Sequence, residues 1–407
     1  MKIVVIGAGV VGVTTAWYLT RDGHEVTVLE AREGVALETS FGNAGGVCPG
    51  FAGPWAAPGM PLKAMGWMFR AAAPLKIRPQ ASLAQWSWLA RFTANCTASR
   101  FAANKAEMQR VAHYSKDCLV ALREETGIAY DHGTGGVLQI FQTADEVAAG
   151  ERSAAVLRRM EVPHRLLDAR EVLEVEPGLA RSDLEMAGGL QLTTDETGDC
   201  HLFCKALAAR AAEAGARFRF NAPVTGFRRE GGRIASLSLG AEEITADAFV
   251  VATGPWTALL KPLGLKVPVY PVKGYSLTAQ ITDPQAAPRS SVMDEHSKVM
   301  ITRLGSRLRA AGVAELAGFD RAMPAPVLSA LRKRVEALFP GAAAYEEASY
   351  WHGFRPMTPG GPSRVERTGY HNLYLNLGHG SNGWTQAAGT GRMLADLVAG
   401  GSGRPPG

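Results

Sequence analysis

The pattern of apolar and polar positions at the start of the chain predicts a strand, a helix and a second strand. The strands are the apolar runs at 3–6 and 26–29. Similar runs predict strands at 135–141, 217–220, 223–227, 233–238, 243–245, 249–252 and 373–376, and a group of strands within 267–313. Strands that alternate with helices in this way predict an α/β fold.

Helical spacing of apolar residues predicts the remaining elements. It covers 61–73, 81–127, 144–160, 168–175, 199–214, 326–338 and 385–399. Residues 39–60 are instead rich in Gly, Ala and Pro, which predicts a long ordered loop of the kind that often carries function. The length of 407 residues exceeds what one core usually serves, so we expect two domains.

The turn after the first strand carries a Gly-x-Gly-x-x-Gly motif. Gly7 permits a tight turn, Gly9 lets a pyrophosphate approach the backbone, and Gly12 lets the helix pack against the strand. Glu30 ends the second strand, where a carboxylate accepts hydrogen bonds from ribose hydroxyls and repels the 2′-phosphate of NADP. Together these features predict a dinucleotide site; the alternative is a glycine-rich turn in another α/β protein.

Composition and charge exclude several classes of function. The net charge is +5, but the basic residues are spread along the chain, so nucleic-acid binding has little support. The five cysteines are scattered without metal-ligand spacing, so we expect no metal site and a reducing cytoplasm. No apolar run reaches the roughly 18 residues of a spanning helix.

Nucleotide-binding features recur at the middle and end of the chain, which predicts a discontinuous domain. Thr253, Gly254 and Pro255 follow a buried strand, and a strand–glycine–helix unit occupies 371–399. We therefore expect a nucleotide domain of residues 1–55, 190–260 and 345–407. Residues 56–189 and 261–344 would form the interrupting substrate domain.

Seven stretches spread over nearly the whole chain carry a family resemblance. They are Gly9–Val13, Ala36–Ser40, Ala52–Gly59, Asp195–Cys200, Pro271–Ser276, Arg355–Pro359 and Gly378–Gly380. In these stretches the chain resembles the FAD-dependent D-amino-acid oxidase superfamily, and within it the bacterial D-amino-acid dehydrogenases (small subunit). The resemblance implies a Rossmann-like FAD-binding domain interrupted by a mixed α/β substrate domain with an antiparallel sheet.

The resemblance also implies which residues contact FAD. In the order of the chain they are Gly7, Gly9, Gly12, Glu30, Ala31, Arg32, Ser40, Asn43, Ala44, Gly45, Val224, Ala252, Thr253, Gly254, Gly378, His379, Gly380, Gly383, Trp384 and Thr385. His379 is a candidate base, although its backbone position is an alternative reason for its presence. Backbone N–H groups of the 378–383 loop would face the flavin.

Two residues are candidates for holding a substrate carboxylate. Arg355 lies in Gly-Phe-Arg-Pro, where the family has its carboxylate-binding arginine, and a guanidinium binds a carboxylate through two parallel hydrogen bonds. The alternative for Arg355 is a surface ion pair. Tyr275 would add a hydroxyl to the same carboxylate, or it is a core tyrosine. Gly360 replaces an aspartate that the family usually has, and Asn382 replaces an apolar residue, which leaves substrate specificity open.

The predicted reaction is oxidative deamination of D-amino acids to 2-oxo acids and ammonia, by hydride transfer from Cα to FAD. The alternatives are a related amine or imino-acid oxidoreductase (D-hydroxyproline, proline, sarcosine or glycine type), and a non-catalytic electron-transfer flavoprotein subunit. The presence of Arg355 argues against the last of these.

The apolar segment 55–70, which has basic residues in it and beside it, predicts an interfacial element. The resemblance points to a quinone or other respiratory-chain acceptor, with a cytoplasmic protein peripheral on the inner face of the membrane. The alternative for 55–70 is a lid over the active site or packing between domains.

Overall fold

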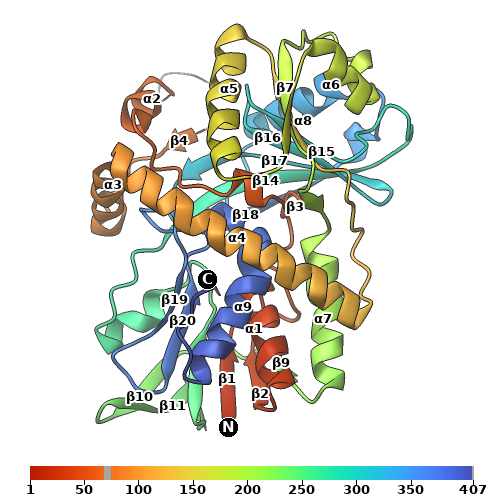
Figure 1. The fold of residues 1–407 in the computed structure, drawn as a ribbon. Helices are drawn as coiled ribbons and strands as arrows, with labels where there is room; N and C mark the ends of the chain where they lie inside the picture. The colour runs from red at the N-terminus through yellow and green to blue at the C-terminus, as the bar shows by residue number, and fades with distance from the viewer. Residues whose placement is uncertain (68–74, 406–407) are drawn as a thin grey trace.

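The computed structural model describes residues 1–67 and 75–405 and contains two large sheets (Figure 1). The first sheet has, in spatial order, β19 (Arg364–Arg367), β20 (Leu373–Leu377), β13 (Ala248–Val251), β1 (Lys2–Ile6), β2 (Glu25–Leu29) and β9 (Arg217–Arg219). All pairings in this sheet are parallel except the edge pair β19–β20. The sheet therefore joins strands from the beginning, middle and end of the chain.

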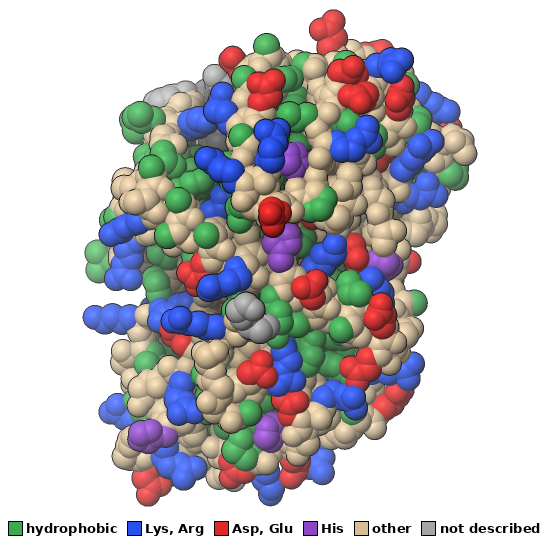
Figure 2. Space-filling view, viewed as in Figure 1, with side chains coloured by type: hydrophobic (Ala, Val, Ile, Leu, Met, Phe, Trp, Pro, Cys, Tyr) green, Lys and Arg blue, Asp and Glu red, His purple; other side chains and the backbone are tan. Residues whose placement is uncertain are grey.

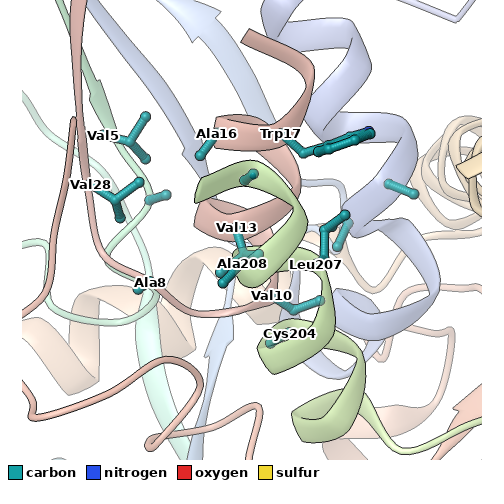
Figure 3. Close-up of a cluster of buried hydrophobic side chains, with 14 of the residues drawn as sticks. Val5, Ala8, Val10, Val13, Ala16, Trp17, Val28, Cys204, Leu207 and Ala208 are labelled. Carbon is teal, nitrogen blue, oxygen red and sulfur yellow. The ribbon is translucent and has the colours of Figure 1, made fainter. Parts of the chain in front are cut away.

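Helices cover one face of the first sheet and a small sheet covers the other. On the helical face lie α1 (Val10–Arg21), α7 (Cys200–Glu213) and α9 (Gly383–Val398). Figure 3 shows part of this core, where Val5 and Val28 of the sheet lie near Val13 and Ala16 of α1. The opposite face is covered by β10 (Gly226–Glu230), β11 (Arg233–Leu239), β12 (Glu242–Ile244) and the 3-10 helix Ala258–Leu263. Burial on both faces explains why β1 and β13 are apolar almost throughout.

The second sheet is mainly antiparallel. Its order is β18 (Ser349–Met357), β14 (Tyr270–Gln280), β17 (Arg307–Leu316), β16 (Val299–Leu304), β15 (Ser291–Asp294), β5 (Val137–Phe141), β7 (Gly188–Leu192) and β6 (His164–Leu167), with β4 (Leu75–Ile77) beside β17. Helices α6 (Ala169–Val175) and α8 (Ala325–Leu338) pack against one face, and α5 (Ala144–Arg159) packs against β5 and β7. The face of β14–β18 that these helices leave free borders a large cavity.

The predicted helix 81–127 is two helices, α3 (Leu83–Asn95) and α4 (Ala98–Thr126). The break occurs because the side chain of Thr97 accepts from the N–H of Arg100, which starts a new helix. In Figure 1, α4 runs obliquely between the two sheets, and it packs against α9. The predicted helix 61–73 is present as α2 (Met60–Trp67), and its last residues fall outside the described part of the chain.

Two predicted domain boundaries differ from the strand pairing. Residues 349–357 form β18 and residues 188–192 form β7, and both strands belong to the second sheet. The boundaries at 345 and 190 placed most of these residues in the nucleotide domain. The reason is that an apolar strand gives no local sign of which sheet it will join. The predicted strands of 267–313 do lie in the second sheet.

Close packing of α9 depends on small residues, which gives a first prediction. A Cβ at Gly389 would lie 2.7 Å from the Cα of Ser115 in α4, so Gly389→Ala forces the two helices apart. We expect a loss of about 1–3 kcal/mol in the free energy of unfolding, measured in urea, despite the better helix propensity of alanine. Gly369→Ala is the control because a Cβ there meets nothing within 4 Å. Equal stabilities of the two variants would contradict the packing account.

Candidate active site

The turn between β1 and α1 is closed by contacts that only glycine permits. Gly7 has a φ of +103°, and a Cβ there would lie 2.7 Å from the carbonyl oxygen of Ala252. A Cβ at Gly12 would lie 1.8 Å from the carbonyl oxygen of Gly7. A Cβ at Gly9 would instead meet only Ser40 Oγ, at 3.6 Å, and Gly9 borders the cavity. Of these three glycines, only Gly9 has free space on the side where a Cβ would lie.

Glu30 is fixed by backbone donors at the tip of β2. Its Oε2 accepts from the N–H of Ala8 at 2.7 Å, and its Oε1 accepts from the N–H of Arg32 at 2.9 Å. Each carboxylate oxygen has a second acceptor site, which remains available to hydroxyl donors on the cavity side. The hydroxyl of Ser40 accepts from the N–H of Val10 at 3.1 Å, so the 39–60 loop is tied to the start of α1.

A single cavity of about 830 Å³ connects this turn to the second sheet. It brings together most of the predicted cofactor residues: Gly7, Gly9, Glu30, Ala31, Arg32, Ser40, Asn43, Ala44, Val224, Ala252, Thr253, Gly254, His379, Gly380, Gly383, Trp384 and Thr385. Gly12, Gly45 and Gly378 are not on its wall. Gly12 faces Gly7, Gly45 packs on Leu304, and Gly378 packs on Thr358, so each of the three supports the wall from behind.

The start of α9 faces the cavity, and His379 is fixed beside it. The Nε2 atom of His379 lies 3.0 Å from the Oγ1 atom of Thr390, which is 11 residues further along the chain in α9. Burial lowers the pKa of His379 to about 4, so its ring is neutral at physiological pH. The loop around Gly380 and Gly383 then leads into the N-terminus of α9, where free N–H groups and the helix dipole favour negative charge.

Arg355 points into the same cavity from β18. Its Nη1 donates to the carbonyl oxygens of Val313 at 3.2 Å and Lys273 at 3.4 Å, and its guanidinium lies 6.0 Å from the centre of the Trp55 ring. A Cβ at Gly274 would lie 2.2 Å from Nη1, so a glycine is needed beneath the side chain. Within the described residues Arg355 forms no ion pair. Desolvation lowers its pKa to about 10.

The structure does not bring the Tyr275 side chain to Arg355. Tyr275 is paired with His352 and Arg355 with Val272, and odd and even positions of β14 face opposite sides of the sheet. The hydroxyl of Tyr275 donates to Glu315 Oε2 at 2.6 Å. Glu315 Oε2 also lies 3.0 Å from Lys273 Nζ, which is fully buried. Tyr275 borders the cavity, but its ring belongs to the second core, which agrees with the alternative of a core tyrosine.

Pairing across the second sheet supplies wall residues that the sequence did not reveal. Trp351 pairs with Ser276, Ser276 with Ala311, Ala311 with Met300, and Met300 with Met293. All five lie on the wall of the cavity. The alternation within each strand is visible in the sequence, but which face meets the cavity follows only from the register.

Asp195 is a buried acid beneath the loop that carries Cys48 and Phe51. Its Oδ1 lies 3.5 Å from the N–H of Gly50, while Oδ2 has no hydrogen-bond partner in the described structure. Burial raises the pKa of Asp195 to about 7. The carboxyl is therefore partly neutral at physiological pH, and this feature was not predicted from the sequence.

Comparisons with known proteins agree with this geometry. The chain matches the family described as FAD dependent oxidoreductase (DAO) over residues 2–397. The structure of L-proline dehydrogenase from P. horikoshii is 21% identical, with a TM-score of 0.76, covering 99% of this chain and 95% of that chain. Glycine oxidase from Bacillus cereus ATCC 14579 is 22% identical, with a TM-score of 0.74 and coverage of 98% and 95%. For iminodiacetate oxidase from Chelativorans sp. BNC1 the identity is 20%, the TM-score 0.72 and the coverage 98% and 95%. At these identities the likeness to the structures shows a shared fold.

The raised pKa of Asp195 predicts a pH-dependent effect of Asp195→Asn. In the unfolded chain this acid ionises near its ordinary pKa, about 4, so the wild type loses stability as the pH rises from about 4 to 7. Asparagine removes that loss. We expect the unfolding free energy of Asp195→Asn relative to wild type to rise by about 2–3 kcal/mol between pH 5 and pH 8. Asp183→Asn, at an exposed position, should show no such trend. A difference that is constant with pH for Asp195→Asn would refute the assignment.

Proposed function

The chain belongs to the family of FAD-dependent oxidoreductases, and we propose that within this family it deaminates D-amino acids oxidatively to 2-oxo acids and ammonia. The observation that carries this proposal is Arg355, a desolvated guanidinium on the cavity wall without a carboxylate partner among the described residues. A buried charge is costly unless it is paired. A substrate carboxylate would supply the missing anion through two parallel hydrogen bonds.

The residues of the cavity fit FAD. The open backbone at Gly9 accommodates a pyrophosphate, and Glu30 has acceptor sites available for ribose hydroxyls. The cavity then continues to Arg355 and to the start of α9, which leaves room for a flavin between them. FAD, when bound, supplies a two-electron acceptor for the hydride of the substrate Cα–H.

The remaining steps are assigned to residues of the chain. Arg355 orients the substrate through its carboxylate, which leaves Cα as the reacting centre. The N-terminus of α9 would favour negative charge on a cofactor held beside it. The imine product is hydrolysed by water. His379 is neutral and is held by Thr390, so no general base is assigned to it. The substrate amine enters the reaction in its neutral form.

A second candidate function is oxidation of a cyclic or secondary amino acid. The same arginine would hold such a substrate, and the proteins of similar fold include an L-proline dehydrogenase and a glycine oxidase. Met293, Met300 and Trp351 lie on the wall of the same cavity and would be available to either class of substrate. Comparison of the enantiomers of alanine and proline as substrates separates the two functions.

Replacement of Arg355 tests the proposed role directly. Arg355→Leu should lower kcat/KM for D-alanine about 30- to 1,000-fold, mainly through KM, because the charge-assisted pair with the carboxylate is lost. FAD absorbance should be retained. The control is Arg170→Leu, whose side chain is 82% exposed in α6. An unchanged kcat/KM in Arg355→Leu would remove this residue from the substrate site.

We further propose that the α2–α3 surface associates with anionic membranes and favours a quinone acceptor. Leu62 and Met65 of α2 are 74% and 59% exposed, and Leu83 and Trp86 of α3 are 89% and 53% exposed. Figure 2 shows apolar and basic side chains together along the left edge, where Figure 1 places α2 and α3. None of the described helices is long and apolar enough to cross a bilayer.

Segment 55–70 also borders the cavity. The two alternatives predicted for it, a membrane-interfacial element and a lid over the active site, are therefore compatible. Trp55 and Met60 lie on the cavity wall, with Leu75 and Phe92 beside them. Lys63 is exposed between the two apolar residues of α2. An apolar acceptor that reaches the surface at α2 would therefore meet the cavity over a short path. Residues 68–70 lie outside the described part of the chain.

Vesicle binding tests the surface proposal. We expect the holoenzyme to sediment with vesicles of anionic lipid at low salt, and to be released by about 0.5 M salt because the electrostatic attraction is screened. The double variant Leu62→Glu/Met65→Glu should lose sedimentation, whereas Met160→Glu, an exposed apolar site on α5, should retain it. A quinone should re-oxidise the enzyme faster than O₂. Absence of vesicle binding at low salt, with peroxide formed at every turnover, would indicate a soluble oxidase.

A further inference from the structure

The cofactor loop, defined here as residues 38–46, lacks strand partners over most of its length. Ser40, Asn43 and Ala44 of this loop lie on the cavity wall. Only its last residue enters a strand, β3 (Gly46–Val47). Backbone carbonyls in such a loop need other hydrogen-bond donors when they are buried. Within the loop, the N–H of Phe41 donates to the carbonyl oxygen of Glu38 at 2.9 Å and the N–H of Gly45 donates to Asn43 Oδ1 at 2.8 Å. Further hydrogen bonds come from outside the loop.

Arg309 of β17 supplies those donors from the second sheet. Its Nη1 donates to the carbonyl oxygens of Phe41 at 3.0 Å and Asn43 at 3.3 Å, and its Nε donates to Thr278 Oγ1 at 2.8 Å. The side chain is only 6% exposed, and its Nη2 lies 3.7 Å from Asp199 Oδ2, the N-cap of α7. A charged donor at a buried site is worth more than a neutral one. Arg309 thus joins the cofactor loop to both sheets.

A second link lies at the start of the loop. Thr39 Oγ1 donates to the carbonyl oxygen of Phe354, the residue before Arg355, at 2.8 Å. The carboxylate of Glu38 accepts from Arg321 Nη2 at 3.0 Å and is also paired with Arg32. The loop is therefore attached to the strand that carries the proposed substrate arginine.

Arg321 belongs to a segment that is itself anchored at three points. We call residues 318–323 the strap; they lie between β17 and α8. Phe319 stacks on Trp256 of the nucleotide-binding half at 5.7 Å between ring centroids. Asp320 Oδ2 lies 2.9 Å from Lys273 Nζ, which also donates to the carbonyl oxygen of Ala322 at 3.0 Å. These anchors hold Arg321 over Glu38.

We propose that Arg309 and Arg321 are positioning residues that hold the cofactor loop closed over FAD and so set how slowly the cofactor is released. Arg309 acts from inside, on loop carbonyls, and Arg321 acts from the surface, on Glu38. Neither needs to touch FAD, because each acts through the loop that lines the cavity. The proposal depends on the FAD site alone and holds for either candidate substrate.

The test measures FAD release from the holoenzyme by the rise of flavin fluorescence after dilution. Arg309→Met should release FAD at least about tenfold faster than wild type, since charged hydrogen bonds at a buried site are lost. Arg321→Met should give a smaller change, about three- to fivefold, because the pair with Glu38 is partly exposed. Arg321→Lys should fall between Arg321→Met and wild type. Arg181→Met removes a comparable ion pair, 2.7 Å from Asp283, within the substrate domain, and should leave release unchanged.

A second readout separates positioning from general stability. A purely structural role would lower Tm equally with and without FAD, whereas positioning lowers the gain in Tm that FAD provides. Glu38→Gln should release FAD at least as fast as Arg321→Met, because it also loses the pair with Arg32, and adding Arg321→Met to Glu38→Gln should give no further increase. Should Arg309→Met fail to fold, the Arg321 and Glu38 variants decide the proposal by themselves. Release rates equal to wild type in Arg321→Met, or additive effects in the double variant, would overturn it.

Discussion

The Arg355 guanidinium lies in a cavity between the two sheets, where its hydrogen-bond partners among the described residues are backbone carbonyls and the Trp55 ring lies beside it. Desolvation disfavours its charge, and no carboxylate among the described residues offsets that cost. Strand β18 holds it in place, and Gly274 leaves the space it occupies. An anion in the cavity would offset this cost, and the carboxylate of an amino acid is the anion that we propose.

At the opposite end of the cavity, beside the turn between β1 and α1, the constraint is that backbone atoms approach one another closely. At Gly7 and Gly12, neighbouring carbonyl groups occupy the space that a Cβ would need, whereas at Gly9 that space is open. The two ends are connected by the cofactor loop, which receives its hydrogen bonds from the second sheet. Cofactor and substrate sites are therefore not independent domains placed side by side. Arg309, Thr39 and Arg321 connect this loop to the second sheet and to the strap.

Short-range motifs in the sequence predicted the nucleotide-binding half of the protein. The glycine motif, Glu30 and the β–α–β order act over short spacing, and they predicted a dinucleotide site in an α/β fold. FAD was predicted from the family resemblance, and both the fold and the cofactor are confirmed. Arg355 was identified from a motif, and its place on the cavity wall agrees with the prediction. Its role with substrate stays a prediction.

The sequence could not predict features that depend on pairing between distant segments. Tyr275 and Arg355 lie on neighbouring strands, and only the register of β14 against β18 shows that their side chains face opposite sides of the sheet. Arg309 and Phe41 are 268 positions apart, so no spacing could connect them. The strand at 349–357 was expected in the nucleotide domain, and its pairing in the second sheet could not be predicted for the same reason. The burial of Asp195 likewise depends on the loop at Gly50, which lies 145 positions away.

The most direct test of the central claim is anaerobic mixing of the FAD-loaded enzyme with single amino acids, followed by the visible absorbance of the flavin. The account predicts rapid loss of absorbance with D-alanine, none with L-alanine, and slow reduction of Arg355→Leu by D-alanine at the same concentration. Reduction by L-proline or glycine but not by D-alanine would contradict the proposed substrate class. Reduction of Arg355→Leu as fast as wild type would contradict the role of the buried guanidinium itself.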